Sequence, residues 1–207
     1  MVGGPLPGGK PASASCARGA SRGAPGPAPR PPAAYTAAVI RPERSDDDAA
    51  IHDLTVIAFD PMPFSDGTEA PIVRALRDAG DLTVSLVDEE DGEIIGHVAF
   101  SPVTVDGADV GWYGLGPISV RPDRQRRGVG RRLVAAGLDE LRARGARGCA
   151  LIGNPAVYGP MGFVGDDALT YRGLGDGLVQ RIVLEGDPVR GELRFADAFE
   201  AYEDAHE

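Results

Sequence analysis

Residues 114–133 read GLGPISVRPDRQRRGVGRRL, and this stretch decides the fold. A strand candidate that ends at Val120 leads into a loop rich in arginine and glycine, and the loop leads into a helix. The first backbone N–H groups of a helix have no partner within it, so together with the helix dipole they can bind an anion. Gly128 and Gly130 let the backbone approach a pyrophosphate closely, because neither has a Cβ atom. The stretch therefore predicts a phosphate-binding loop.

Three types of phosphate-binding loop have this strand–loop–helix context. The P-loop needs a closing Gly-Lys-Ser/Thr, which is missing here. The dinucleotide fingerprint would place its third glycine at Leu133, and its acidic residue, about 20 residues further on, would fall in the apolar run 149–152. The coenzyme A loop, Gln/Arg-x-x-Gly-x-Gly/Ala, fits, because Arg124 or Gln125 leads into residues 127–130. Nucleotide binding by the same loop stays an alternative, which a preference for ATP or NAD over coenzyme A would reveal.

With this loop the sequence resembles the GNAT superfamily of N-acetyltransferases. A second motif, LIGNPAVYGPMGF at residues 151–163, is similar to the stretch G-D/N-P-x-x-Tyr-x-x-x-Gly-Phe of a branch of small bacterial-type predicted N-acetyltransferases. Residues 96–103 and 195–199 also match this branch, although Asp197 stands where the branch more often has proline. The resemblance covers roughly residues 38–199. It implies an α/β GNAT (acyl-CoA N-acyltransferase) fold, with a mixed central sheet that is splayed at the cofactor site and flanked by helices.

The strand before the loop contains an unusual proline, Pro117. Proline cannot donate a hydrogen bond to a neighbouring strand, so we expect a bulge or a splay there that frees backbone groups. GNAT folds admit the pantetheine of acetyl-CoA at such a splay. The resemblance therefore implies acetyl-CoA as cosubstrate, and cofactor contacts from the following residues: Ile118, Ser119, Val120, Arg126, Arg127, Gly128, Val129, Gly130, Arg131 and Asn154.

The resemblance also implies catalytic roles. Tyr158 matches the tyrosine that protonates the departing thiolate in many GNAT enzymes, although a packed structural tyrosine is the other interpretation. Asn154 stands where many members of the branch have aspartate; it can still hydrogen-bond the cofactor, but it is no base. Glu69, His97 and Tyr113 are candidates for the general base, acting directly or through water, and we select Glu69.

Each of the weaker candidates has a structural interpretation. His97 lies in an apolar strand, which favours a hydrogen-bonded structural histidine. Glu69 would also serve as a first-turn acid of a helix, where the helix dipole favours a negative charge. Cys149 lies in an apolar run without a neighbouring histidine, so we expect an inert buried thiol rather than a nucleophile. We expect no metal site.

The net charge of −10 is unevenly distributed. Residues 1–34 have four basic and no acidic residues, so the rest of the chain carries −14. Residues 121–147 are the exception, with nine arginines against three acids, and this local excess suits the phosphates of coenzyme A. An acidic body argues against nucleic-acid and anionic-membrane partners. The absence of a long apolar run and the presence of only two cysteines lead us to expect a cytoplasmic protein. We expect a monomer or a homodimer.

Residues 1–34 contain 8 Pro, 7 Gly and 8 Ala without apolar periodicity, so we expect a disordered tail. Residues 35–207 form the predicted N-acetyltransferase domain. The long helix after the loop should place Leu133, Val134, Gly137, Leu138 and Leu141 on one buried face and end at Gly145. The other expected elements are a strand at 36–40, helices from Ser45 to Ala58 and from Thr68 to Gly80, strands at 82–87, 93–105, 110–120 and 149–153, a short helix, and strands near 169–172, 178–184 and 192–195.

Two function classes stay open at this point. The chain is either an active acetyltransferase that works by direct attack in a ternary complex, or a catalytically silent acyl-CoA-binding sensor or partner module. The second class is supported by Asn154 and by the lack of an obvious base. The sequence does not choose among small amines, peptide N-termini, protein lysines and aminoacyl conjugates as the acceptor.

Overall fold

The computed structural model describes residues 38–63, 65–165, 167–174 and 177–203. The predicted tail 1–34 and the beginning of the strand expected at 36–40 lie outside these residues. All described residues belong to the unit Tyr35–Glu207. Along the chain the elements are β1 (Val39–Pro42), α1 (Asp48–Phe59), α2 (Glu69–Ala79), β2 (Val84–Glu90), β3 (Glu93–Val105), β4 (Ala108–Val120), α3 (Val129–Ala143), β5 (Gly148–Ile152), α4 (Pro155–Tyr158), β6 (Val164–Gly165), β7 (Leu169–Thr170), β8 (Val179–Val183), β9 (Gly191–Arg194) and α5 (Asp197–Glu203).

The sheet is mixed, as predicted. Its strand order is β1-β2-β3-β4-β5-β8-β6, and β9 pairs with the end of β3 and with β7. Asp106-Gly107, a residue pair typical of tight hairpins, forms the turn between β3 and β4, and both residues have positive φ angles. β4 and β5 form a parallel pair, which α3 connects, and the short strands β7 and β9 form another.

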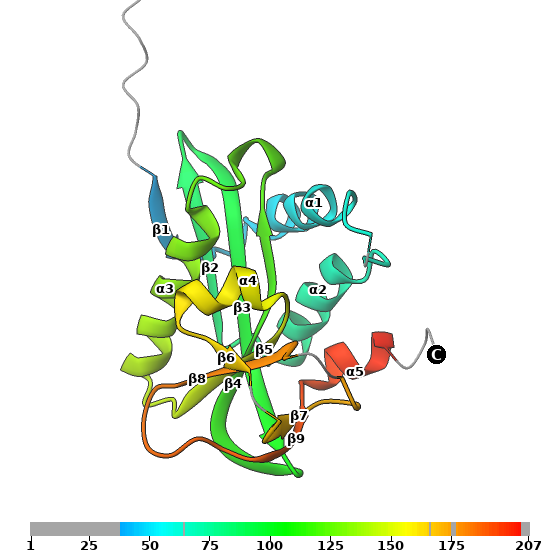
Figure 1. Cartoon of the computed structure of the whole chain (residues 1–207). Helices are drawn as coiled ribbons and strands as arrows, with labels where there is room; N and C mark the ends of the chain where they lie inside the picture. The colour runs from blue at the N-terminus through cyan, green and yellow to red at the C-terminus, as the bar shows by residue number, and fades with distance from the viewer. Residues whose placement is uncertain (1–37, 64, 166, 175–176, 204–207) are drawn as a thin grey trace, which may run out of the picture. The chain divides into compact units, whose positions relative to one another are not determined.

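Helices cover both faces of this sheet: α3 lies on one face, and α1 and α2 lie on the other (Figure 1). The predicted buried face of α3 is confirmed for all five residues. Gly137 is required there because a Cβ atom would lie 2.2 Å from Cε2 of Phe100. The core under α3 also contains Leu115, Cys149 and Leu151 from the sheet. α2 begins after Thr68 and ends before Gly80, which is its left-handed C-cap, in agreement with the helix expected from Thr68 to Gly80.

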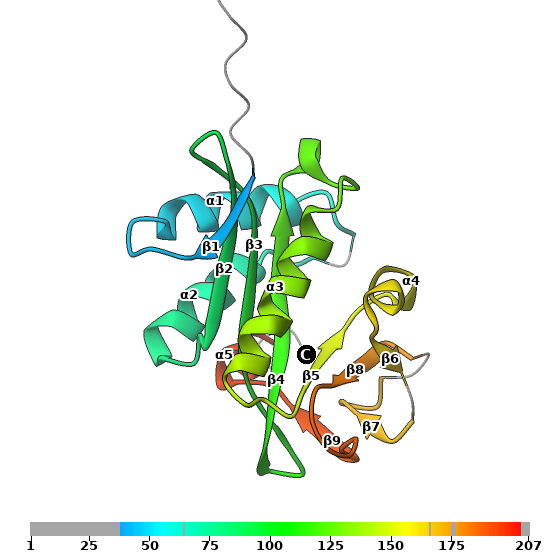
Figure 2. The ribbon, with the colours of Figure 1, turned by 90° about the vertical axis from the view of Figure 1, so that its left-hand side faces the viewer.

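The sheet opens between β4 and β5. Trp112, Tyr113 and Gly114 pair with residues 148–150, but beyond these pairs the two strands diverge (Figure 2). β5 continues its pairing with β8 on its other side, where Ile152 faces Val179. The edge of β4 after Gly114 is therefore not paired with β5, so the predicted splay is confirmed.

The predicted irregularity at Pro117 is a bulge. Phe100 of β3 faces Leu115 and Val98 faces Ile118, so Gly116 and Pro117 lie opposite the single residue Ala99. A bulge of this kind bends its strand and interrupts the regular pairing. It lies where β4 leaves β5.

Several expectations about the edges of the fold were wrong. The helical spacing of Ile51, Leu54, Ile57 and Ala58 predicts the buried face of the first helix. Ile57 is instead 54% exposed, and Thr55 is buried in α1. The strand expected at 169–172 is limited to Leu169–Thr170, and β6 and α5 were not predicted.

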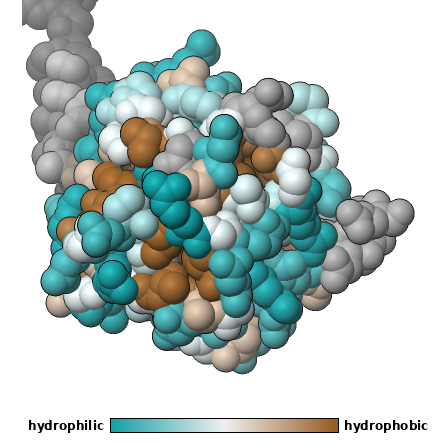
Figure 3. All heavy atoms as spheres, turned by 60° about the horizontal axis from the view of Figure 1, so that its bottom comes forward, coloured by the Kyte–Doolittle hydropathy of each residue, from teal (hydrophilic) through white to brown (hydrophobic). Residues whose placement is uncertain are grey.

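On the face in Figure 3, which lies at the bottom of Figure 1, hydrophobic residues form several patches divided by hydrophilic side chains. A second core cluster joins β3, β4, β7 and β9 around Trp112 and Phe195.

Candidate active site

The loop before α3 has the geometry that the sequence predicts for an anion site. Gly128 is the N-cap residue, with φ 85° and ψ 1°, and Arg126 also has a positive φ of 58°. The N–H of Arg132 donates to the carbonyl of Gly128 at 3.0 Å. In the part of the chain that the structure describes, the N–H groups of residues 126–131 donate to no protein acceptor. A row of free donors therefore precedes the first complete turn of α3.

The start of α3 lies against the splayed part of β4. A Cβ atom at Gly130 would be 3.7 Å from Cδ1 of Ile118 and 3.8 Å from Cγ2 of Val120. Predicted cofactor residues from the strand and from the loop are thus brought together. The Ser119 side chain does not join them: it is buried, and its hydroxyl donates to Oγ1 of Thr55 in α1 at 3.0 Å. Ser119 can face the cofactor only through its main chain.

Arg124 and Gln125, the candidates for the first position of the loop motif, both use their side chains for hydrogen bonds within the protein. Nε2 of Gln125 donates to the carbonyl of Val120 at 3.1 Å, which closes the loop on the end of β4. Nε of Arg124 donates to Glu90 at 2.6 Å. Neither contact was predicted. Both shape the loop, and neither side chain is free for a phosphate in this arrangement.

The local excess of arginine is smaller than the sequence suggests. Acidic residues of the β2–β3 hairpin neutralise part of it, together with two acids of α3. Three arginines, Arg126, Arg127 and Arg131, are exposed. They form no ion pair with any residue that the structure describes. These three are therefore the available cations of the loop. The pairs are Arg121–Glu93, Arg124–Glu90, Arg132–Asp88, Arg142–Asp139 and Arg144–Glu140, and Asp123 also pairs with both Arg121 and Arg124.

Tyr158 lies on α4, directly after the strand that diverges from β4. Its ring meets Phe163 edge-on at 6.1 Å between centroids. Gly153 is required beneath the ring, because a Cβ atom there would lie 2.5 Å from Cε2 of Tyr158. Burial raises the pKa of Tyr158 above its usual value of 10. Its hydroxyl has no hydrogen-bond partner among the described residues, so the structure does not supply the local partner expected of a purely structural tyrosine.

Asn154 begins α4. Its Oδ1 accepts a hydrogen bond from the N–H of Ala156 at 2.9 Å, which is an N-cap. Asparagine and aspartate cap a helix about equally well, which accounts for asparagine at this position. The amide nitrogen of its exposed side chain remains available.

Glu69 lies in a cavity of about 190 Å³ between α1 and α2, on the face of the sheet opposite α3. Oγ of Ser65 donates to its Oε2 at 2.8 Å. Thr55 also lines this cavity, and its hydroxyl accepts the hydrogen bond from Ser119 of β4. The cavity is therefore connected to the splayed strand by one hydrogen bond. As expected from the sequence, Glu69 is also a first-turn acid of α2.

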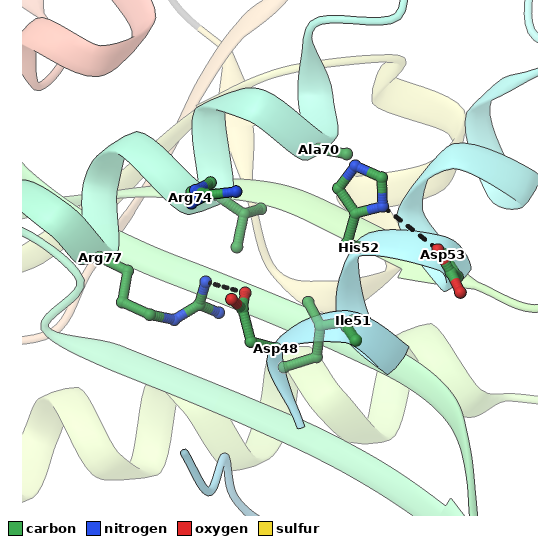
Figure 4. A pocket seen from close by; sticks show the side chains of 9 residues that line it. Asp48, Ile51, His52, Asp53, Ala70, Arg74 and Arg77 are labelled. Atoms are coloured by element: carbon green, nitrogen blue, oxygen red, sulfur yellow. Dashed lines mark hydrogen bonds and ion pairs between the residues drawn. The ribbon is translucent and has the colours of Figure 1, made fainter. Parts of the chain in front are cut away.

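A larger cavity, of about 290 Å³, lies between the same two helices and contains no predicted site residue (Figure 4). Two pairs of its side chains contact each other: Arg77 and Asp48 at 2.6 Å, and His52 and Asp53 at 3.3 Å. Arg74, which also lines the cavity, lies 3.8 Å from Asp78 of the same helix.

The other base candidates lie inside the fold. His97 is fully buried; its Nε2 is 2.9 Å from Oγ of Ser85, and burial lowers its pKa to about 4. Tyr113 packs against the core under α3. Cys149 is fully buried, and burial raises the pKa of its thiol, in agreement with the expected inert role.

Within the described ranges, no group of three or more histidine, cysteine or acidic side chains is arranged to hold a metal ion. None of the helices in those ranges is long and apolar enough to cross a membrane.

Comparison with known proteins identifies the fold. The model of the family described as "Acetyltransferase (GNAT) family" matches residues 49–158. YhbS of Escherichia coli (strain K12), named an uncharacterized N-acetyltransferase, is 43% identical over 101 residues, which are 48% of this chain and 60% of that protein. The sequence match thus spans less than two thirds of that relative.

Two solved structures are similar over most of their length. A GNAT family acetyltransferase from Brucella melitensis in complex with acetyl-CoA has 44% identity and a TM-score of 0.70, covering 78% of this chain and 97% of that one. YhbS from Escherichia coli in complex with CoA has 34% identity and a TM-score of 0.71, covering 79% and 92%. With a splayed sheet, an anion loop and these relatives, the chain belongs to the GNAT family of acetyltransferases.

Proposed function

We propose that this protein transfers the acetyl group of acetyl-CoA to an amine acceptor by direct attack in a ternary complex. The observation that carries the proposal is the divergence of β4 from β5 next to a row of free backbone N–H groups at residues 126–131. The relatives from Brucella melitensis and Escherichia coli were solved with acetyl-CoA and with CoA. A cofactor of this chemistry suits both the loop and the open strand edge.

In the proposed complex the pyrophosphate lies on the amides of residues 126–131, with Arg126, Arg127 and Arg131 supplying positive charge. The pantetheine arm follows the edge of β4 at residues 118–120, whose main-chain groups are not paired with β5. Asn154 contributes its amide nitrogen from the far side of the opening. This arrangement directs the thioester toward the bulge in β4.

The reaction needs an attacking amine, a thioester within its reach, a donor that polarises the thioester carbonyl, and an acid for the leaving thiolate. The amine nitrogen attacks the thioester carbonyl, the N–C bond forms, and the C–S bond then breaks. A backbone N–H of the bulged strand polarises the carbonyl and stabilises the negative charge that develops on its oxygen. Tyr158 gives its proton to the departing thiolate, and its raised pKa keeps the phenol protonated at neutral pH. The proton lost by the amine passes to a base.

Glu69 is the proposed base, directly or through a water molecule. Its cavity lies on the face of the sheet opposite α3, so an acceptor held there approaches the thioester from the side opposite the pyrophosphate loop. Burial of His97 leaves Glu69 as the more accessible of the two. This support is positional: Glu69 lies beside Thr55, which contacts β4 through Ser119.

The second candidate is a silent acyl-CoA-binding module, favoured by the capping role of Asn154 and by the buried His97. Binding of acetyl-CoA does not separate the two, because both bind it. Release of free thiol with a panel of amines does: the enzyme gives amine-dependent release, and the silent module gives none.

A further inference from the structure

Arg132 stands apart from the other arginines of the loop. Nη2 of its guanidinium donates to Oδ2 of Asp88 at 2.7 Å, and Asp88 is fully buried at the end of β2. We propose that Arg132, held in place by Asp88, is a further binding residue for the pyrophosphate of the cofactor. The proposal rests on the proposed function. It adds a fourth arginine, held by an ion pair, to the three that form none with the described residues.

The position of Asp88 makes it a firm anchor. It lies at a register shift of the β2–β3 pairing, between Asp88 and Glu89, and its Oδ1 has no partner among the described residues. A buried carboxylate is strongly unfavourable unless a cation pairs with it. The guanidinium of Arg132 is that cation, so breaking its ion pair with Asp88 would cost free energy. Asp88 is thus a positioning residue for Arg132.

The packing of α3 against β3 holds the helix above this anchor. A Cβ atom at Gly96 would lie 2.7 Å from Cγ1 of Val129 and 2.8 Å from Cδ1 of Leu133. The first turns of α3 therefore sit directly on the backbone of Gly96. This close approach lets the Arg132 side chain reach back to Asp88, while its backbone N–H closes the first helical turn.

The other edge of the guanidinium faces the loop. A Cβ atom at Gly128 would lie 3.9 Å from Nη1 of Arg132, and no hydrogen bond joins this nitrogen to any residue that the structure describes. The side chain is 45% exposed. An anchored guanidinium therefore presents free N–H donors beside the free amides of the loop, which is the planar, fixed geometry that suits phosphate oxygens.

The neighbouring paired arginines are less suited to this role. Arg124 uses Nε for Glu90 and Nη1 for Asp123, and Arg121 uses Nε and Nη2 for Asp123 and Nη1 for Glu93. Each spreads its donors over two carboxylates. Arg132 uses one nitrogen for one carboxylate and keeps the edge nearest Gly128 free.

The test compares three variants by calorimetric titration with acetyl-CoA and with acetyl-dephospho-CoA, which retains the pyrophosphate and lacks the 3′-phosphate. Arg132→Gln removes the guanidinium. The control is Arg142→Gln, which makes the same change near the other end of α3, at an arginine paired with Asp139 on the surface. Because Arg132→Gln leaves Asp88 buried without its partner, the double variant Asp88→Asn/Arg132→Gln provides a neutral pair of amides in the same place.

Arg132→Gln and the double variant should each weaken both ligands about tenfold, as expected for one lost hydrogen bond to a charged group. Arg142→Gln should leave both affinities within about twofold. Wild-type affinity in the double variant would mean that Arg132 acts only by neutralising Asp88, and would overturn the proposal. A loss confined to acetyl-CoA would overturn the assignment to the pyrophosphate. Failure of the wild-type protein to bind either ligand would instead refute the proposed function.

Discussion

Replacement of Gly128 with valine should abolish acetyl-CoA binding while the fold persists. Gly128 has a φ of 85°, a region that costs a non-glycine residue about 1–2 kcal/mol and is especially unfavourable for a β-branched one. The loop relieves this strain by rotating its peptides, which turns the free amides away from the phosphates. A hydrogen bond to a charged group contributes about 1.5–3 kcal/mol, so loss of two lowers affinity by roughly a hundredfold or more.

The buried face of α3 lies beyond the loop, so the strain should lower the melting temperature by only about 2–8 °C in a chain of this size. Gly145→Val, just beyond the other end of α3, is the matched control. Gly145 also has a positive φ, of 75°, and a Cβ atom there would meet nothing within 4 Å. Calorimetric titration with acetyl-CoA should show affinity within about twofold of wild type for this control. Unchanged affinity in Gly128→Val, at any melting temperature, would refute the loop assignment.

Four further predictions concern other parts of the chain. Tyr158→Phe should lower kcat roughly ten- to a thousandfold, as expected for a lost proton donor, with little change in acetyl-CoA affinity; near-wild-type turnover would make the residue structural. Gly137→Ala should cost about 1–3 kcal/mol of unfolding free energy in urea, because its Cβ atom would overlap the Phe100 ring at 2.2 Å. Burial lowers the pKa of His97 to about 4, so its contribution to stability is complete above about pH 6.5 and is lost as the pH falls toward 4. The free energy of unfolding should therefore fall by about 2 kcal/mol between pH 7 and pH 5. His97→Gln should flatten this pH dependence, which urea unfolding at several pH values measures. A protein that begins near Ala33 should keep its melting temperature and cofactor affinity, because residues 1–34 lack apolar periodicity; a large loss of either would show that the tail contributes to the domain.

The parts of the fold that were predictable follow local rules. The end of α2 follows from Gly80, because a left-handed glycine after a helix is a signal within a few residues. The hairpin at Asp106-Gly107 follows from the turn residues alone, and the bulge follows from a proline in a central strand. In α3, the helical period selects the buried face without knowledge of what it packs against.

The remaining features depend on contacts between distant segments. Thr55 replaces Ile57 in the core because its hydroxyl meets Ser119, 64 residues further along the chain. The partner of Arg132 is Asp88, 44 residues away, and no local rule joins them. The acidic run at residues 88–93 was a usable signal, since a strongly basic loop in an acidic protein requires nearby acids. The cavity of Glu69 forms only when α1 and α2 pack together.

The most direct test of the account is an acceptor screen with acetyl-CoA, in which thiol release and the mass of each amine are followed together. At least one amine class should give amine-dependent thiol release with an equal amount of N-acetylated product, and Gly128→Val should lose both. Tight binding of acetyl-CoA without acetylation of any amine across small amines, peptide N-termini, protein lysines and aminoacyl conjugates would contradict it and would identify the protein as a silent acyl-CoA-binding module.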